Sequence, residues 1–278
     1  MAASAQVCYR RDMTVESKSS VPVSAPASAG QLLQSWRKRR RMSQLDLALT
    51  AKVSAKHVSF LETGRAQASR EMLLHLSRYL EIPPREQNRL LLSAGYAPYF
   101  HETPVGDQRF ENARLIIDLI LRSHEPYPAI AMDRYWNSVL YNRALEPLLS
   151  ALAPELRQPP INLLRLSLHP GGVAPRILNF GEWRDHLLMR LRQQINATDD
   201  PALADLLREV EHYPHPTYEP SEPTSQLAVP LVLQTPAGVL RFYTTTMVFG
   251  SPVDITLSEL AIETFLPADA ATASAMRP

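Results

Sequence analysis

Apolar residues recur at three- and four-residue spacings from residue 30 to about residue 99, a period typical of short amphipathic helices. Polar residues that favour helix starts and ends interrupt this pattern at intervals. Five helices are therefore predicted in the stretch. Their apolar positions, in chain order, are Leu32, Leu33 and Trp36; Leu45, Ala48 and Leu49; Val58 and Leu61; Met72, Leu73, Leu76 and Leu80; and Leu90, Leu91 and Leu92.

A very short turn joins the second and third of these helices. Ser43 is suited to begin the second helix, with Asp46 as the acid of a capping box, and Ser54 is suited to begin the third. The third helix then ends at Thr63-Gly64. Because the small side chain of Ala48 lets the two axes cross closely, the segment predicts a helix-turn-helix.

The pattern changes after residue 109, where strand-like and helical segments alternate. A helix over 110–122 places Leu115, Ile116, Leu119 and Ile120 on one face. The remaining predicted elements are strands at 128–132, 138–141, 227–234 and 239–249, the last two joined by a hairpin at 235–238, and helices through 145–149, 162–168, 181–195 and 200–212. This part of the chain is therefore predicted to be α+β.

Composition divides the chain in the same way. Residues 1–29 are rich in Ser, Ala, Pro and Val without a sustained period, which predicts a disordered leader. We expect a helical domain at 30–100, a linker at 101–108, an α+β domain at 109–269 and a flexible tail at 270–278.

The single cysteine, Cys8, excludes an internal disulfide and favours a reducing compartment. No apolar run suggests a signal peptide or a membrane span. The cytoplasm is the expected location, with no membrane partner.

The formal net charge of +1 conceals two regions of opposite sign. Residues 30–100 carry twelve basic and five acidic side chains, whereas residues 101–278 carry fourteen basic and twenty-one acidic ones. Such asymmetry indicates that the first region meets a polyanion.

The segment from Gln44 to Glu62, followed by Gly64-Arg65, resembles the Cro/repressor class of helix-turn-helix, also called the xenobiotic-response-element type. The resemblance extends over about residues 30–95 and implies binding to double-stranded DNA. Lys52 stands where the family usually has a turn glycine, and at positive φ it would cost about 1 kcal/mol relative to glycine. Lys52 is also a candidate for a phosphate contact.

This resemblance implies roles for particular side chains. The outward face of the third helix carries Ala55, Lys56 and Ser59, the candidates for reading base edges in the major groove. The candidates for holding phosphates are Arg37, Arg41, Gln44 and Arg65. Two copies related by a two-fold axis are expected, because one such module reads only a few base pairs.

In the second region, residues 125–144 resemble the start of a PAS-like sensor, and the whole region looks like the ligand-binding domain of the MmyB-like transcription regulators. The resemblance implies a five-stranded sheet and helices around an apolar pocket for a fatty-acid-like ligand. The candidate pocket residues are Trp136, Leu140, Leu163, Leu166, Trp183, Leu187 and Phe242, with Arg165 or Arg176 to hold a carboxylate.

Other chemistry finds little support in the sequence. It has no nucleophile elbow, phosphate-binding loop, dinucleotide fingerprint or His-Glu-x-x-His motif, so neither enzyme activity nor a cofactor is predicted. His212 and His215 lack thiol or carboxylate partners for a metal. Two hypotheses stay open: a dimeric DNA-binding regulator that senses a lipophilic ligand, and a DNA-bound adaptor whose second domain binds another protein.

Overall fold

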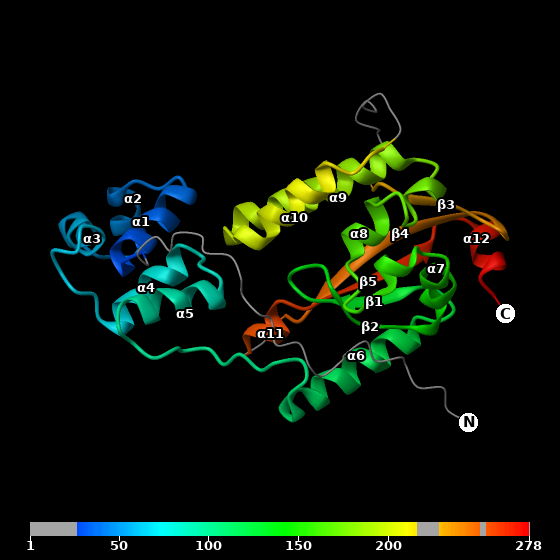
Figure 1. The fold of residues 1–278 in the computed structure, drawn as a ribbon. Coiled ribbons are helices and arrows are strands. Elements are labelled where there is room, and N and C mark those ends of the chain that lie inside the picture. The colour runs from blue at the N-terminus through cyan, green and yellow to red at the C-terminus, as the bar shows by residue number, and fades with distance from the viewer. Residues whose placement is uncertain (1–26, 216–227, 251–253, 278) are drawn as a thin grey trace. The chain divides into compact units, whose positions relative to one another are not determined.

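The computed structural model describes residues 27–215, 228–250 and 254–277 (Figure 1). The chain divides into two units: a helical unit up to Glu102, which also includes residues 254 and 255, and a mixed unit that begins at Thr103. The predicted leader lies almost wholly outside the described residues. In the described part of the chain, no helix is both long and apolar enough to cross a membrane.

The helical unit contains the five predicted helices. They are α1 (Ala29–Arg39), α2 (Gln44–Thr50), α3 (Ala55–Glu62), α4 (Arg70–Tyr79) and α5 (Pro84–Ser93). Ser43, Ser54 and Ser69 each accept a hydrogen bond from a backbone N–H in the first turn of the helix that follows. Asp46 completes a capping box with Ser43. The local start signals in the sequence are thus confirmed.

The buried side of α2 differs from the prediction. Leu47, Ala48 and Ala51 are buried in the core of the helical unit, whereas Leu45 and Leu49 are exposed. Ala48 is buried in a helix that packs against α3, and Leu47 and Ala51 share its side of the helix. In a helix this short, two exposed leucines suffice to shift the apparent apolar face.

A buried ion pair connects the first three helices. Arg37 of α1 donates from Nε and Nη2 to the carboxylate of Glu62 at 2.6 and 2.8 Å. Gln44, the first residue of α2, donates to the same carboxylate at 2.9 Å. The third guanidinium nitrogen, Nη1 of Arg37, donates to the carbonyl of Met42. The carboxylate at the end of α3 is therefore bonded to both preceding helices.

The mixed unit is built on an antiparallel sheet of five strands in the order β2-β1-β5-β4-β3. The strands are β1 (Ala129–Met132), β2 (Ser138–Tyr141), β3 (Leu231–Thr235), β4 (Gly238–Val248) and β5 (Ala261–Pro267). The predicted hairpin between the last two predicted strands is confirmed, with Thr235 paired to Gly238. The central strand β5 was not predicted from the residue pattern.

Helices cover both faces of this sheet (Figure 1). Ile130 and Phe242 pack in a cluster with residues of α8, α9 and α10, whereas Ala131 and Ile262 pack with α6 on the opposite face. The helices of this unit are α6 (Glu111–Ser123), α7 (Glu146–Ser150), α8 (Leu163–Leu168), α9 (Phe180–Thr198), α10 (Pro201–Glu211), α11 (Ile255–Ser258) and α12 (Ala270–Ala275).

Two expectations for this unit require correction. The flexible tail predicted at 270–278 instead contains α12, held because Asp269 caps its first turn and buried Thr272 accepts a hydrogen bond from the backbone N–H of Arg241. On α6, the residues that pack onto the sheet are Ile117 and Leu121. Of the face predicted to be apolar, Leu115, Ile116 and Leu119 are exposed.

Replacing Glu62 with glutamine tests the buried ion pair. The substitution keeps the shape of the side chain but leaves the buried guanidinium of Arg37 without a counter-charge, so we expect a loss of about 3 kcal/mol in the free energy of unfolding. Urea titration followed by circular dichroism measures it. The exposed Glu71 provides the control, since Glu71→Gln is expected to change stability by about 0.5 kcal/mol or less. Equal losses for both variants would contradict this role.

The same pair predicts a pH dependence. Burial alone would raise the pKa of Glu62, but hydrogen bonds from Arg37 and Gln44 outweigh it and lower the pKa from its ordinary 4.5. The folded state then binds fewer protons than the unfolded chain, so the carboxylate adds stability above pH 4.5 that is lost as the pH falls through the folded-state pKa. The urea midpoint between about pH 6 and about pH 3 should fall more steeply for the wild type than for Glu62→Gln.

Candidate functional site

The outward face of α3 carries the three predicted base-reading residues. Val58 and Leu61 turn into the core, and this leaves Lys56 exposed and Ala55 and Ser59 partly exposed. Ser54 caps the helix, so Ala55 and Lys56 begin its first turn and Ser59 follows one turn later. The structure therefore places the three side chains on one accessible surface at the start of the helix.

Phe60 is a site residue that the sequence analysis missed. The ammonium nitrogen of Lys56 lies 5.5 Å from the centre of its ring, and the guanidinium of Arg65 lies 6.0 Å from the same ring. Both distances fit cation–π contacts, which hold long flexible cations in preferred positions. The spacing of an aromatic residue four positions after Lys56 was the available signal.

Three of the candidate phosphate-binding cations lie at the surface. Arg41, Lys52 and Arg65 are exposed, and Lys52 occupies the turn between α2 and α3 with φ of 55°. Positive φ at Lys52 is the conformation anticipated for the position where the family usually has glycine. Gln44 is half-buried and uses its side-chain amide to bind Glu62.

Arg37 has a different environment from the one anticipated. Only 7% of the residue is exposed, and Nε, Nη1 and Nη2 all donate hydrogen bonds within the protein. A guanidinium used in this way has little left to offer a phosphate. Arg37 instead fixes the position of the helix that carries Lys56.

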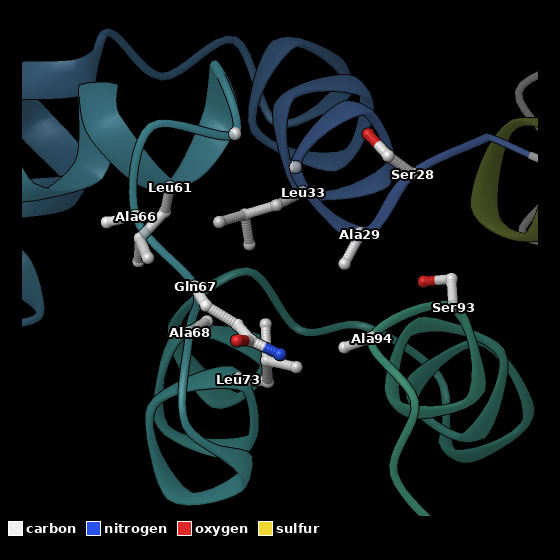
Figure 2. Close-up of a pocket in the computed structure, with 12 residues that line it drawn as sticks. Ser28, Ala29, Leu33, Leu61, Ala66, Gln67, Ala68, Leu73, Ser93 and Ala94 are labelled. Atoms are coloured by element: carbon white, nitrogen blue, oxygen red, sulfur yellow. The ribbon is translucent and has the colours of Figure 1, made fainter.

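A surface pocket of about 270 Å³ also lies in the helical unit (Figure 2). Small side chains such as Ala29, Ala66 and Ala94 form much of its wall, and Gln67 and Ser93 add polar groups to it. None of the residues predicted to contact DNA lines it. This pocket is thus separate from the reading face of α3.

In the mixed unit, most of the predicted pocket residues come together on one face of the sheet. The cluster beneath α8 and α9 contains, buried or packed against it, Trp136, Leu163, Leu166, Trp183, Leu187 and Phe242. Leu140 does not join them. It packs with α6 on the opposite face, because it lies opposite Ala131 in the strand register.

Arg165 already holds a carboxylate. Its Nε and Nη2 each donate to Glu209 at 2.7 Å, and the hydroxyl of Tyr213 donates to the same carboxylate. The hydrogen bond from Arg165 lowers the pKa of Glu209 despite partial burial. Burial and the bond to Glu209 raise the pKa of Tyr213 to about 12. Arg165 is therefore occupied within the protein.

Unlike Arg165, Arg176 and Trp183 each have a side-chain donor that no acceptor of the described chain binds. Nη2 of Arg176 and Nε1 of Trp183 are buried and have no hydrogen-bond partner within the described chain. Arg176 ends the 3-10 turn Ala174–Arg176, and Trp183 lies in the first turn of α9, so both come from the same end of that helix. By contrast, the indole N–H of Trp136 donates to Gln194 at 2.8 Å.

A buried charge pair that the sequence analysis did not identify lies in the same cluster. Glu263 of β5 is buried, and Arg190 of α9 donates to both of its oxygens at 2.8 and 2.9 Å. The same guanidinium lies 4.9 Å from the ring of Trp136. Arg190 thus connects α9, the centre of the sheet and one predicted pocket residue.

A basic helix-turn-helix followed by an α+β unit with its own apolar core defines a class of two-domain DNA-binding proteins. Comparison with family models supports each half. Residues 33–87 match the helix-turn-helix family, and residues 113–278 match the MmyB-like transcription regulator ligand binding domain. Because the second match spans more than half of the chain, the chain belongs to that family. Comparison with curated proteins found no match.

The two matches together make this protein a DNA-binding transcription regulator with a ligand-binding domain. Both families consist of regulators and binding domains rather than enzymes.

Replacing Lys52 with glycine tests two effects of the lysine, the energetic cost of its backbone conformation and the contribution of its charge to DNA binding. Glycine removes the cost of the left-handed conformation, so the helical unit should become more stable by about 1 kcal/mol. Loss of the charge should weaken DNA binding and reduce its salt dependence by about one phosphate contact. Urea titration and fluorescence anisotropy at several salt concentrations measure the two effects. An unchanged salt dependence would show that Lys52 makes no phosphate contact.

Proposed function

We propose that two copies of this chain bind a specific double-stranded DNA site, with α3 of each copy in a major groove. Lys56, Ser59 and Ala55 read base edges, while Arg41, Lys52, Gln44 and Arg65 hold phosphates. The observation that carries this proposal is the single exposed face at the start of α3, flanked by exposed cations. A lysine there can donate to guanine, and the alanine methyl suits thymine.

The mixed unit, in this proposal, binds a lipophilic molecule that bears a carboxylate. Its support is the donors on Arg176 and Trp183 that have no partner among the described residues, together with the apolar cluster of tryptophan, leucine and phenylalanine. A buried donor without an acceptor is costly, and a ligand carboxylate would supply one. Arg165 has no such need, because Glu209 already satisfies it.

Ligand binding would regulate DNA binding by shifting the equilibrium between two arrangements of the dimer. The ligand must bind one arrangement of the dimer more tightly than another, since equal affinity for both would change nothing. Half-site spacing then determines which arrangement fits the DNA.

Replacing Lys56 with alanine tests the DNA contact. Loss of one base contact should weaken binding to the selected site about tenfold and relax the preference for one base pair. A site selected from random duplexes, followed by fluorescence anisotropy, gives both values. Lys38, exposed on α1, is the matched control, and Lys38→Ala should keep the base preference. A chain that selects no site at physiological salt would overturn the proposal.

Replacing Trp183 with phenylalanine tests the ligand contact. The variant keeps the aromatic ring and removes only the unpartnered N–H, so the affinity for dodecanoate should fall about tenfold. Dodecanol, which lacks the carboxylate, provides the control and should bind both proteins equally. Isothermal titration measures these affinities. If neither compound binds and native mass spectrometry finds the purified protein empty, the protein-binding adaptor replaces the ligand sensor as the better explanation.

A further inference from the structure

The helix α6 presents an apolar stripe to solvent. Leu115, Ile116 and Leu119 are 64%, 52% and 68% exposed, whereas Ile117 and Leu121 pack onto the sheet. Large apolar side chains gathered in this way indicate a surface that is covered in the working protein. The sequence period that placed these residues on one face was correct, but within one copy that face has no partner in the described structure.

Further apolar side chains are exposed on the same face of the sheet. Tyr243 lies opposite Leu266, and Met247 lies opposite Ile262, whose side chain packs against α6. Since directly opposed residues share a face, Tyr243, Met247 and Leu266 are on the α6 side of the sheet, and all three are partly exposed. They add to the area that a partner could bury there.

Charged residues border the stripe in an order that favours one kind of partner. Glu111 begins α6 and pairs with Arg114, Arg122 lies near its end and pairs with Asp118, and the side chains of Glu111 and Arg122 are both about half exposed. At about 3.6 residues per turn, both fall along the same border of the stripe. An antiparallel copy of α6 would place each Glu111 beside the other copy's Arg122, whereas in a parallel copy this border would lie on opposite sides of the pair and these charges would not meet.

We propose that α6 pairs with α6 of a second copy of this chain about a two-fold axis. In this antiparallel arrangement Leu115 of one copy lies opposite Leu119 of the other, and each Glu111 meets an Arg122 across the same border. The opposed helix dipoles add a small favourable contribution. This inference rests on the dimer of the proposed function and identifies the surface that forms it.

The position of α6 in the chain suits this role. It is the first long helix after the helical unit, separated from α5 by residues 94–110. Pairing there would join the two DNA-binding units through the connections at 94–110.

The first test replaces Leu119 with lysine in the full-length chain. Because the side chain is exposed, the fold should be retained, while the dissociation constant of the dimer should rise at least tenfold. Sedimentation equilibrium distinguishes the 31.2 kDa monomer from the dimer. Leu178, 58% exposed elsewhere in the same unit, is the control, and Leu178→Lys should remain dimeric.

Charge exchange tests the antiparallel direction. Glu111→Arg and Arg122→Glu should each weaken the dimer, and the double variant should bind itself more tightly than either single variant. In a parallel pair the borders lie on opposite sides, so these charges would not meet in any variant and the double variant would bind itself no more tightly than the single ones. Absence of recovery would therefore overturn the antiparallel pairing.

Two outcomes would overturn the α6 interface as a whole: a wild-type monomer at micromolar concentration, as expected if another segment of the chain covers the stripe, or a Leu119→Lys variant that dimerises like the wild type. Site selection with the Lys56→Ala and wild-type proteins reports on DNA reading independently. A dimer that assembles through α6 but selects no DNA would instead refute the proposed function alone.

Discussion

The buried carboxylate of Glu62 needs hydrogen-bond donors from within the helical unit. The packing of the first three helices depends on the residues that supply them. A buried carboxylate without partners would destabilise the fold by several kcal/mol. Arg37 from α1 and Gln44 from α2 both bind it, so the end of α3 is held by the two helices before it. The direction of α3, and with it the exposure of Lys56 and Ser59, depends on this network. Substitutions in the network should therefore affect DNA reading without touching DNA.

Local signals in the sequence predicted the elements of the helical unit and four of the five strands, because capping and period act within a few residues. Ser43 and Ser54 cap their helices as predicted, and the hairpin at Thr235 follows from its own turn. The central strand β5 has no such signal. Glu263 and Thr264 interrupt its apolar pattern, and their burial is made acceptable by Arg190 and Thr245, which are distant in the sequence.

The site residues also divide into those that a local pattern identifies and those whose role depends on a residue distant in the sequence. Ala55, Lys56 and Ser59 share a helical face, which any sequence shows at 3.6-residue spacing. Whether an arginine is available for a ligand depends instead on a partner far along the chain. Arg37 is occupied by a residue 25 positions away and Arg165 by one 44 positions away, whereas a donor of Arg176 stays unpartnered in the described structure. Residue type and spacing suggested all three, and only the fold distinguishes them.

The basic side chains of the two units differ in their surroundings. In the mixed unit, Arg134, Arg165 and Arg190 each form ion pairs with carboxylates of that unit, so their charge is largely neutralised in place. In the helical unit, Lys52, Lys56 and Arg65 lie exposed beside the reading face. Attraction to DNA is therefore concentrated on the helical unit. In the proposed function, a ligand in the mixed unit would act on the geometry of the dimer rather than on that attraction. In that proposal, the surface through which two copies meet would determine whether ligand binding alters DNA binding.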